Sequence, residues 1–308
     1  MIQAERLTRL FGRTPAVREL SFHVHRGEVM GLLGPNGAGK STTMKMLTCF
    51  LPPSSGQARV NGHSLDDSLA VRRSIGYLPE NAPMYIDLDV QTHLRFVGRM
   101  QGLPQGTLAD RIAEMARVCG LEQVLRRRID ELSKGYRQRV GLAASMLHDP
   151  ACLILDEPTT GLDPNQISEI RQLIRRLGES KTVLLSSHVL AEVEAVCDRV
   201  MIIDRGQLRA IGTAEELARQ AGDGQTLYVR FLDDGRSVLE MLATDGVEAE
   251  ATGEVNGWWL HCPDADMPLA ERTFRAAVAK DVVIVEMHAR KTSLEDVFHR
   301  LTASRGSA

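Results

Sequence analysis

The chain has 308 residues, of which 43% are hydrophobic and 25% are charged. This composition is close to the globular average and excludes a disordered chain, a collagen-like repeat and a coiled-coil array. The 37 Lys and Arg residues nearly balance the 40 Asp and Glu residues, and the net charge of −3 offers no basic field for nucleic acid. No nucleic-acid partner is therefore expected.

The apolar runs are too short for a membrane span. The longest of them, Val29–Leu33 and Ala151–Leu155, hold five residues each, whereas a spanning helix needs about twenty. The first ten residues carry Glu5, Arg6 and Arg9 and show no secretory leader pattern. The sequence therefore predicts a cytoplasmic chain.

From Ile2 to about Ile211, short apolar runs alternate with stretches of helical periodicity. This alternation predicts an α/β domain with a largely parallel sheet. The predicted strands are Val29–Leu33, Ile75–Leu78, Cys152–Leu155, Val183–Leu185 and Val200–Ile203, and the clearest helices are Asp110–Cys119 and Gln166–Leu177. A capping box of Thr213 and Glu216 begins a short helix that closes the first domain, residues 1–221.

After a linker at Ala221–Gly224 the pattern changes, and a second, smaller α+β domain is predicted for residues 222–308. Its elements are strand Thr226–Leu232, helix Arg236–Ala243, strands Val247–Thr252 and Asn256–His261, helix Pro268–Ala279 and strand Val282–Met287. The order βαββαβ is that of a ferredoxin-like sandwich. Strand alternation predicts that one of Trp258 and Trp259 packs in the core while the other is an exposed contact. A last helix is predicted at Ser293–Leu301.

The segment Gly34-Pro35-Asn36-Gly37-Ala38-Gly39-Lys40-Ser41 fits the phosphate-loop pattern Gly-x4-Gly-Lys-Ser/Thr. It follows a predicted strand and precedes a helix-compatible stretch from Thr42, which is the context this chemistry needs. Glycines let successive N–H groups face a phosphate, and the helix N-terminus adds the positive end of its dipole. Lys40 is then placed to reach the β- and γ-phosphates, and Ser41 to bind Mg²⁺.

Two adjacent carboxylates, Asp156 and Glu157, end the buried-type strand Cys152–Leu155. At the carboxyl edge of a sheet both side chains can reach one site. Asp156 suits the coordination of Mg²⁺, and Glu157 is placed to polarise an attacking water, a role that hydrolysis requires. The pair therefore favours a hydrolase over a kinase.

Five motifs follow one another in the order found in ATP-binding-cassette (ABC) ATPases. They are the phosphate loop, Leu132-Ser133-Lys134-Gly135, the strand ending in Asp156-Glu157, Thr160-Gly161-Leu162-Asp163 and the single His188. Over Ile2–Gln220 the chain resembles the ATP-binding subunit of an ABC transporter, most closely the kind paired with separate membrane subunits of the ABC-2 exporter type. The resemblance implies a cassette with a helical subdomain at about residues 85–150.

The resemblance also assigns roles to individual residues. It implies that Glu157, His188 and Lys40 are catalytic, and that Mg²⁺ is held by Ser41, Glu80 and Asp156. The residues implied in ATP binding are Phe11, Gly34, Pro35, Asn36, Gly37, Ala38, Gly39, Lys40, Ser41, Thr42, Ser133, Gly135 and Asp163. Within this set Phe11 matches the ring that stacks on adenine, whereas Ser133, Gly135 and Asp163 match positions that face the nucleotide of the opposite subunit.

The implied function is ATP hydrolysis by a homodimer that closes around ATP and Mg²⁺. Hydrolysis would power export by a separate membrane permease, which the chain would contact through Asn81–Gln101. This would hold the chain on the cytoplasmic face of the membrane. The alternative is a soluble ATP-gated ABC protein that regulates a macromolecular interaction. The smaller domain is expected to be regulatory or dimerising.

Two departures from the family pattern stand out. Glu80 occupies the position of a usual Gln, which adds a negative charge near the triphosphate. Lys134 and Tyr136 stand where Gly and Gln are commoner. We expect these last two residues to weaken or retune dimer closure, which K134G/Y136Q variants would test through ATP-driven dimerisation.

Overall fold

A computed structural model describes residues 1–220, 225–262, 267–290 and Phe298. The predicted linker Ala221–Gly224 and, apart from Phe298, the predicted helix Ser293–Leu301 lie outside these residues. The chain divides into two compact units, Met1–Thr213 and Ala214–Ala308. The short helix α8 (Ala214–Gln220), which the sequence assigns to the first domain, thus groups with the second unit. No helix among the described residues combines the length and the apolar character that a membrane span requires.

The first unit is built around a mixed sheet in the order β10-β9-β3-β8-β7-β6. Its strands are β3 (Val29–Leu33), β6 (Ile75–Leu78), β7 (Cys152–Leu155), β8 (Thr182–Ser187), β9 (Arg199–Asp204) and β10 (Gln207–Gly212). All neighbours pair in parallel except β10 with β9. The α/β prediction is confirmed, and the predicted strands β3, β6 and β7 agree with the structure residue for residue.

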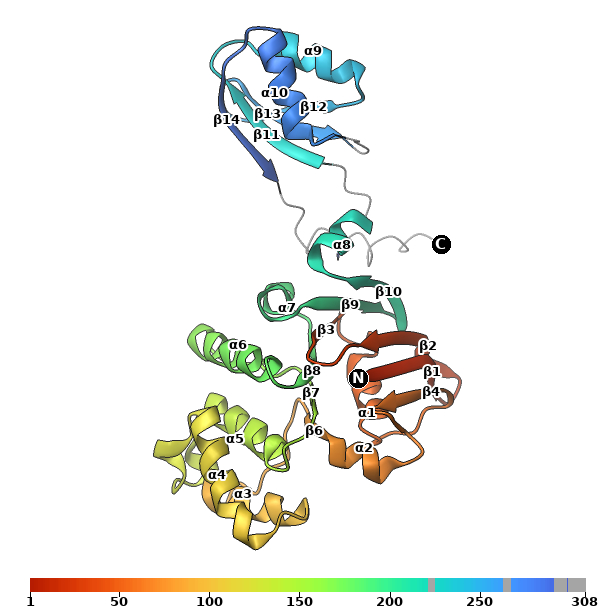
Figure 1. Cartoon of the computed structure of the whole chain (residues 1–308), viewed down its shortest axis with the longest axis vertical. Helices are drawn as coiled ribbons and strands as arrows, with labels where there is room; N and C mark the ends of the chain where they lie inside the picture. The colour runs from red at the N-terminus through yellow and green to blue at the C-terminus, as the bar shows by residue number, and fades with distance from the viewer. Residues whose placement is uncertain (221–224, 263–266, 291–297, 299–308) are drawn as a thin grey trace. The chain divides into compact units, whose positions relative to one another are not determined.

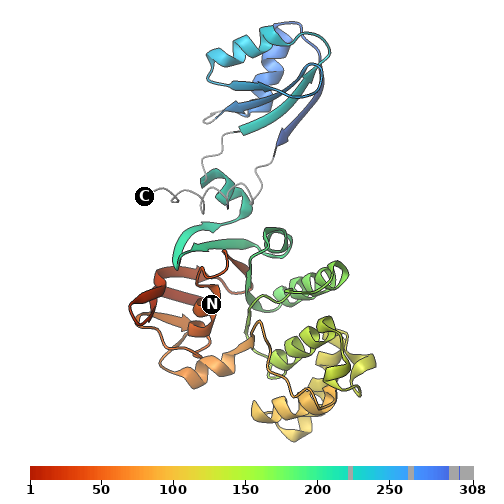
Figure 2. The same cartoon turned by 180° about the vertical axis from the view of Figure 1, so that it is seen from behind.

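Both faces of this sheet are buried. Along β7, Leu153 and Leu155 join one apolar core while Cys152 and Ile154 join the other. Figures 1 and 2 show α6 (Pro164–Gly178) and α7 (Leu190–Val196) on one side, with α1 (Lys40–Leu47) on the other. Strands buried on both faces read as continuous apolar runs, which is why the sequence located them well.

A second, antiparallel sheet lies on the α1 side, in the order β2-β1-β4-β5. It comprises β1 (Ile2–Phe11), β2 (Thr14–Val24), β4 (Ser55–Val60) and β5 (His63–Ser64), and α2 (Ser68–Ser74) follows it. The register of β1 against β2 shifts repeatedly, and Arg6 and Glu19 have φ of +47° and +46°. These irregularities interrupt strict alternation, so the sequence analysis did not predict this sheet.

Three helices pack together beside β6: α3 (Val90–Met100), α4 (Gln105–Cys119) and α5 (Lys134–Met146), with short turns at Glu122–Val124 and Ile129–Glu131. They account for the helical part predicted at about 85–150. The backbone of α5 approaches β6 so closely that a Cβ atom at Gly76 would lie 2.3 Å from the Ser145 carbonyl oxygen.

The second unit contains β11 (Gln225–Phe231), α9 (Arg236–Thr244), β12 (Glu248–Ala251), β13 (Gly257–Cys262), α10 (Leu269–Ala279) and β14 (Ile284–Arg290). The sheet order β12-β13-β11-β14, with all pairs antiparallel, is the connectivity of a split βαβ sandwich. Leu227, Val229 and Leu260 belong to an apolar core with residues of both helices.

Candidate active site

The glycine-rich loop joins the carboxyl end of β3 to the first turn of α1. Gly37 and Gly39 have φ of +80° and +104°, a left-handed backbone that glycine adopts without strain. At Gly39 a Cβ atom would also lie 2.6 Å from the Ala16 carbonyl oxygen. The loop borders a cavity of about 370 Å³, lined by Asn36–Thr42 and by Glu80, Glu157 and His188 from other elements. Unpaired N–H groups at the start of α1 suit an anion there.

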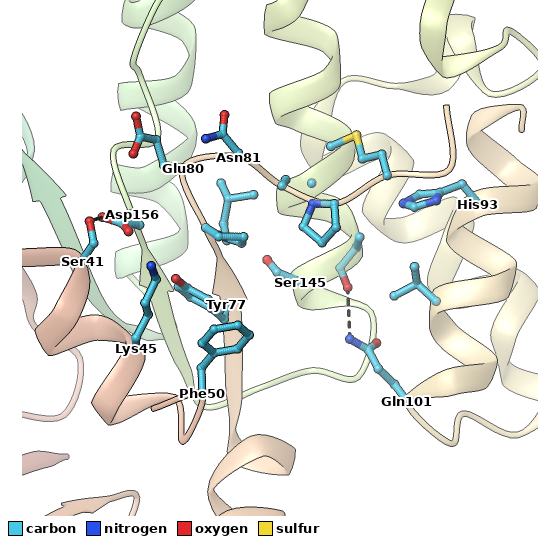
Figure 3. Close-up of a pocket in the computed structure, with 18 residues that line it drawn as sticks. Ser41, Lys45, Phe50, Tyr77, Glu80, Asn81, His93, Gln101, Ser145 and Asp156 are labelled. Atoms are coloured by element: carbon cyan, nitrogen blue, oxygen red, sulfur yellow. Dashed lines mark hydrogen bonds between the residues drawn. The ribbon is translucent and has the colours of Figure 1, made fainter. Parts of the chain in front are cut away.

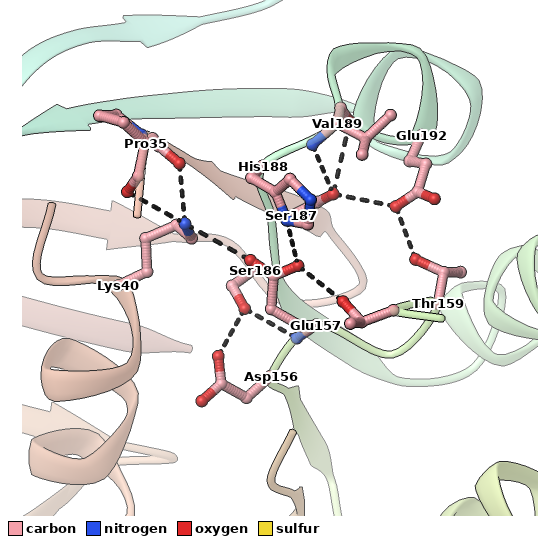
Figure 4. A network of polar contacts seen from close by, with 12 residues as sticks. Pro35, Lys40, Asp156, Glu157, Thr159, Ser186, Ser187, His188, Val189 and Glu192 are labelled. Atoms are coloured by element: carbon pink, nitrogen blue, oxygen red, sulfur yellow. Dashed lines mark hydrogen bonds and ion pairs between the residues drawn. The ribbon is translucent and has the colours of Figure 1, made fainter. Parts of the chain in front are cut away.

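Lys40 is held inside this loop. It is only 6% exposed, and its ammonium donates hydrogen bonds to the carbonyl oxygens of Gly34 (2.7 Å) and Pro35 (3.3 Å). The ammonium also forms an ion pair with Oε1 of Glu157 at 3.4 Å (Figure 4). A phosphate entering the loop would compete with Glu157 for this cation, so phosphate binding and release of the carboxylate are linked.

Oxygen groups gather at the end of β7, where Asp156 is 2% exposed. Its Oδ1 atom accepts hydrogen bonds from the hydroxyls of Ser186 (2.7 Å) and Ser41 (3.1 Å). Glu80 is exposed and, like Ser41, borders the phosphate-loop cavity, whereas Asp156 lines a second cavity that Ser41 and Glu80 also border. Mg²⁺ prefers oxygen ligands and uses one or two carboxylates together with water and substrate phosphates. Asp156 and Ser41 therefore fit a nucleotide-bound Mg²⁺, although the described residues contain no cluster of three His, Cys, Asp or Glu ligands.

Glu157 takes a sharp turn at the end of the strand. Its φ of +51° is unusual for a non-glycine residue, and its N–H donates to the Ser186 hydroxyl at 2.9 Å. The turn directs the carboxylate, 8% exposed, into the cavity instead of across the sheet. There Oε2 accepts a hydrogen bond from the Thr160 hydroxyl at 3.0 Å. Such strain persists where neighbouring contacts hold it, and it is common at active sites.

His188 completes the group at the end of β8. Its Nδ1 atom lies 2.7 Å from Oε2 of Glu157, and its side chain is 45% exposed. Because a carboxylate only accepts hydrogen bonds, Nδ1 carries the proton in this contact, and Nε2 remains to meet a phosphate or water. Lys40, Glu157 and His188, distant in sequence, therefore lie together at one cavity, and their catalytic roles stay a prediction.

Three other predicted residues lie outside the lining of this cavity: Ser133, Gly135 and Asp163. Ser133 is the N-cap of α5, where its hydroxyl accepts from the Tyr136 N–H at 3.3 Å. Asp163 caps α6 in the same manner and accepts from the Gln166 N–H at 2.9 Å. A single chain therefore does not bring its α5 N-terminus to its own phosphate loop.

Lys134 and Tyr136, the two residues of the α5 N-terminus that depart from the family pattern, make contacts within this chain. Lys134 packs against the loop after β7, so that a Cβ atom at Gly161 would lie 2.1 Å from its Nζ. The guanidinium of Arg139 lies 5.9 Å from the centre of the Tyr136 ring. Their effect on dimer closure stays a prediction.

Phe11 also lies apart from the cavity lining. It ends β1, is 52% exposed, and its ring lies 5.0 Å from the guanidinium carbon of Arg9. An exposed ring beside the loop region is compatible with stacking on a base, and its role stays a prediction.

Two residues that support the site, Ser186 and Thr160, have no role predicted from the sequence. Ser186 bridges Asp156 and the backbone of Glu157, and Thr160 holds the Glu157 carboxylate. Both are small hydroxyl residues next to predicted ones, two positions before His188 and three after Glu157. Only their place beside those residues could have indicated them.

The fold and site define a phosphate-loop nucleoside triphosphatase with an Asp-Glu pair at the end of β7, which β8 separates from β3 in the sheet. The family model described as "ABC transporter" matches residues 17–160. The chain is 38% identical over 229 residues to the linearmycin resistance ATP-binding protein LnrL of Bacillus subtilis, covering 74% of this chain and 73% of that protein. It is 34% identical over 306 residues to the Nod factor export ATP-binding protein I of Ralstonia nicotianae, covering 98% and 94% respectively.

Among solved structures, "Structure of ATP binding subunit of ABC transporter" superposes with a TM-score of 0.66 at 32% identity, covering 72% of this chain and 93% of that one. The chain therefore belongs to the ABC transporter family. It is an ATP-binding subunit and an ATPase, and the predicted resemblance is confirmed.

Proposed function

We propose that this chain homodimerises around two ATP–Mg²⁺ complexes and powers export by a separate membrane permease. The observation that carries this proposal is the division of the site: Ser133 and Gly135 lie outside the cavity that contains Lys40 and Glu157. A second copy can supply its α5 N-terminus, whose N–H groups favour a γ-phosphate. The names of the linearmycin resistance and Nod factor export relatives support export as the direction.

In the proposed reaction, Glu157 accepts a proton from a water that attacks the γ-phosphorus, and the bond to the β–γ bridging oxygen breaks. ADP and inorganic phosphate are released. Lys40 binds the β- and γ-phosphates, and His188 contacts the γ-phosphate through Nε2. Ser41 and Asp156 would hold Mg²⁺, which supplies charge neutralisation on the phosphates, with Glu80 as a further oxygen ligand.

The proposed permease contact lies between β6 and the helical group. A cavity of about 610 Å³ there is lined by residues such as Phe50, Tyr77, Met84, His93 and Gln101 (Figure 3). The hydroxyl of Tyr77 and Nδ1 of His93 have no hydrogen-bond partner among the described residues. Burial, and to a lesser extent the charge of Asp156, raises the pKa of Tyr77 to about 12.

Exposed apolar side chains belong to this region: Phe50 (73%) lines the cavity, and Tyr85 (57%) and Met100 (74%) are next in sequence to the lining residues Met84 and Gln101. A surface with large exposed apolar groups and unsatisfied polar atoms favours a partner segment over water. We therefore assign Asn81–Gln101 and the neighbouring Phe50 to the permease contact, which would hold the chain at the cytoplasmic face of the membrane.

Co-isolation from membranes tests this proposal. We expect the wild-type chain to co-purify with a polytopic membrane protein. The double variant Phe50→Asp/Met100→Asp should retain about 10% of the co-purified membrane protein, because charges replace apolar contacts that the partner buries. The control is Leu69→Asp on α2, which is 59% exposed and does not line this cavity. A wild-type chain that never co-purifies with a membrane protein would favour the alternative, a soluble ATP-gated regulator.

We also propose that the second unit adds a dimer contact through the face of its sheet opposite to the one that packs on α9 and α10. Tyr228, Trp259 and His288 form a row there, with ring centres 5.3 Å (Tyr228–Trp259) and 4.8 Å (Tyr228–His288) apart. Trp258 instead packs against the core on the helix side. The same face carries the Arg230–Glu286 ion pair at 3.4 Å, so it presents both charges to a second copy.

Replacing the central ring tests this contact. Trp259→Ala is expected to raise the dimer dissociation constant about tenfold or more, since interface Trp residues often contribute over 1.4 kcal/mol. Analytical ultracentrifugation of the full chain with ATP measures it. Phe274→Ala, on α10 and 56% exposed, is the control. Equal dissociation constants for Trp259→Ala and wild type, with native thermal stability, would refute the contact.

A further inference from the structure

One buried carboxylate connects the two loops that carry Glu157 and His188. Glu192 lies on α7 and is 8% exposed. Its Oε2 atom accepts hydrogen bonds from the hydroxyls of Thr159 (2.6 Å) and Ser187 (2.9 Å), as Figure 4 shows. Both donors are buried as well, at 6% and 1% exposure. A single oxygen atom therefore joins the loop after β7 to the end of β8.

These donors stand beside the proposed catalytic residues. Thr159 is two positions after Glu157, and Ser187 directly precedes His188. The Ser187 oxygen also accepts the Val189 N–H at 3.0 Å, which closes a turn around His188. Moving either hydroxyl would therefore move the backbone from which Glu157 or His188 projects.

The other oxygen of Glu192 faces a cation. Oε1 lies 4.0 Å from Nη2 of Arg171 on α6. A buried carboxylate needs hydrogen bonds and an opposite charge to offset its desolvation, and Glu192 has both. Its surroundings thus favour one fixed position, which suits a group that holds other groups in place.

We propose that Glu192 is a positioning residue for ATP hydrolysis. It fixes the loops so that the Glu157 carboxylate and the His188 imidazole stay in contact at 2.7 Å while water and the γ-phosphate enter. Glu192 itself is absent from the lining of the phosphate-loop cavity and touches no substrate. This role rests on the proposed functions of Glu157 and His188.

Steady-state kinetics of full-length variants tests the role. For Glu192→Ala we expect kcat to fall about 10- to 100-fold, because a displacement near 1 Å of a catalytic group has an effect of this size. KM for ATP should stay within about threefold, since the phosphate loop keeps its contacts. Glu192→Gln retains one acceptor oxygen and should lose less. Glu194→Gln, an exposed carboxylate on the same helix, is the control and should match wild type within about twofold.

A double-mutant cycle shows whether the loss runs through the bridge. Thr159→Val removes one hydroxyl at nearly constant volume, so its effect on kcat should be smaller in the Glu192→Ala background, where no acceptor is left, than alone. Equal effects in both backgrounds would overturn the proposal. So would a Glu192→Ala variant with wild-type kcat and thermal stability, or one in which kcat, KM and thermal stability all deteriorate together.

Parallel assays of Glu157→Gln distinguish a failure of the positioning role of Glu192 from a failure of the general-base role of Glu157. An inactive Glu157→Gln together with a fully active Glu192→Ala overturns the positioning role alone. A fully active Glu157→Gln overturns the general-base assignment on which that role rests.

Discussion

Glu157→Gln is expected to lower kcat for ATP hydrolysis by about 10²- to 10⁴-fold, the contribution typical of a positioned general base. An amide has nearly the same shape and can still accept the hydrogen bond from Thr160, whose hydroxyl lies 3.0 Å from Oε2. It cannot take up the proton of water. Release of phosphate from ATP, measured under saturating ATP, gives the rate.

The same variant should keep ATP and accumulate as an ATP-bound dimer. The phosphate loop is unchanged, and Lys40, which pairs with Glu157 at 3.4 Å, loses its competing carboxylate. Affinity for ATP should therefore be equal to that of wild type or higher. Size-exclusion chromatography with ATP would detect the dimer. The control is Glu122→Gln, which changes an exposed carboxylate distant in sequence from Glu157. A wild-type rate in Glu157→Gln would remove this residue from the base role.

The sequence predicted those parts of the site that consist of short motifs of consecutive residues. The phosphate loop follows β3, and Asp156-Glu157 follows β7. Because parallel strands end at one edge of the sheet, both segments lie at that edge. The motif order located His188, and it located Ser133, whose hydroxyl caps α5. In each case a local pattern determines a local structure.

Other features depend on contacts between distant segments. Glu192 carries no motif, and its importance appears only when Thr159 and Ser187, 33 and five positions away, meet its carboxylate. The left-handed turn at Glu157 is equally invisible in the sequence, since residues other than glycine adopt it uncommonly and no pattern marks which ones do. The bulged strand β1 pairs with its neighbour β2 and also with the distant β4, for example at Ile2 and Val60, and local alternation does not predict this second pairing.

In the proposed mechanism, competition for charges couples ATP binding to hydrolysis. In the structure Glu157 contacts both Lys40 and His188, so the base is engaged by the groups expected to bind phosphate. Triphosphate binding would draw the Lys40 ammonium toward the phosphates and leave the carboxylate for water. An ATPase with this arrangement has its base restrained until the nucleotide is present.

Lys40→Ala is expected to weaken ATP binding about 10- to 100-fold. Hydrogen bonds to charged groups contribute about 1.5–3 kcal/mol each, and about 1.4 kcal/mol corresponds to a tenfold change in dissociation constant. Since Lys40 is 6% exposed, its charge acts on the phosphates with little screening by water. Isothermal titration of the full chain with ATP and Mg²⁺ measures the change.

Lys45→Ala gives a matched control, because Lys45 lies on the same helix but is exposed and lines the cavity assigned to the permease. Its dissociation constant for ATP should remain within about twofold of wild type, as for most surface substitutions. A Lys40→Ala variant that binds ATP as tightly as Lys45→Ala would show that the backbone N–H groups of the loop suffice for the triphosphate. The ion pair with Glu157 would then serve the free protein alone, and competition for Lys40 could not release the base.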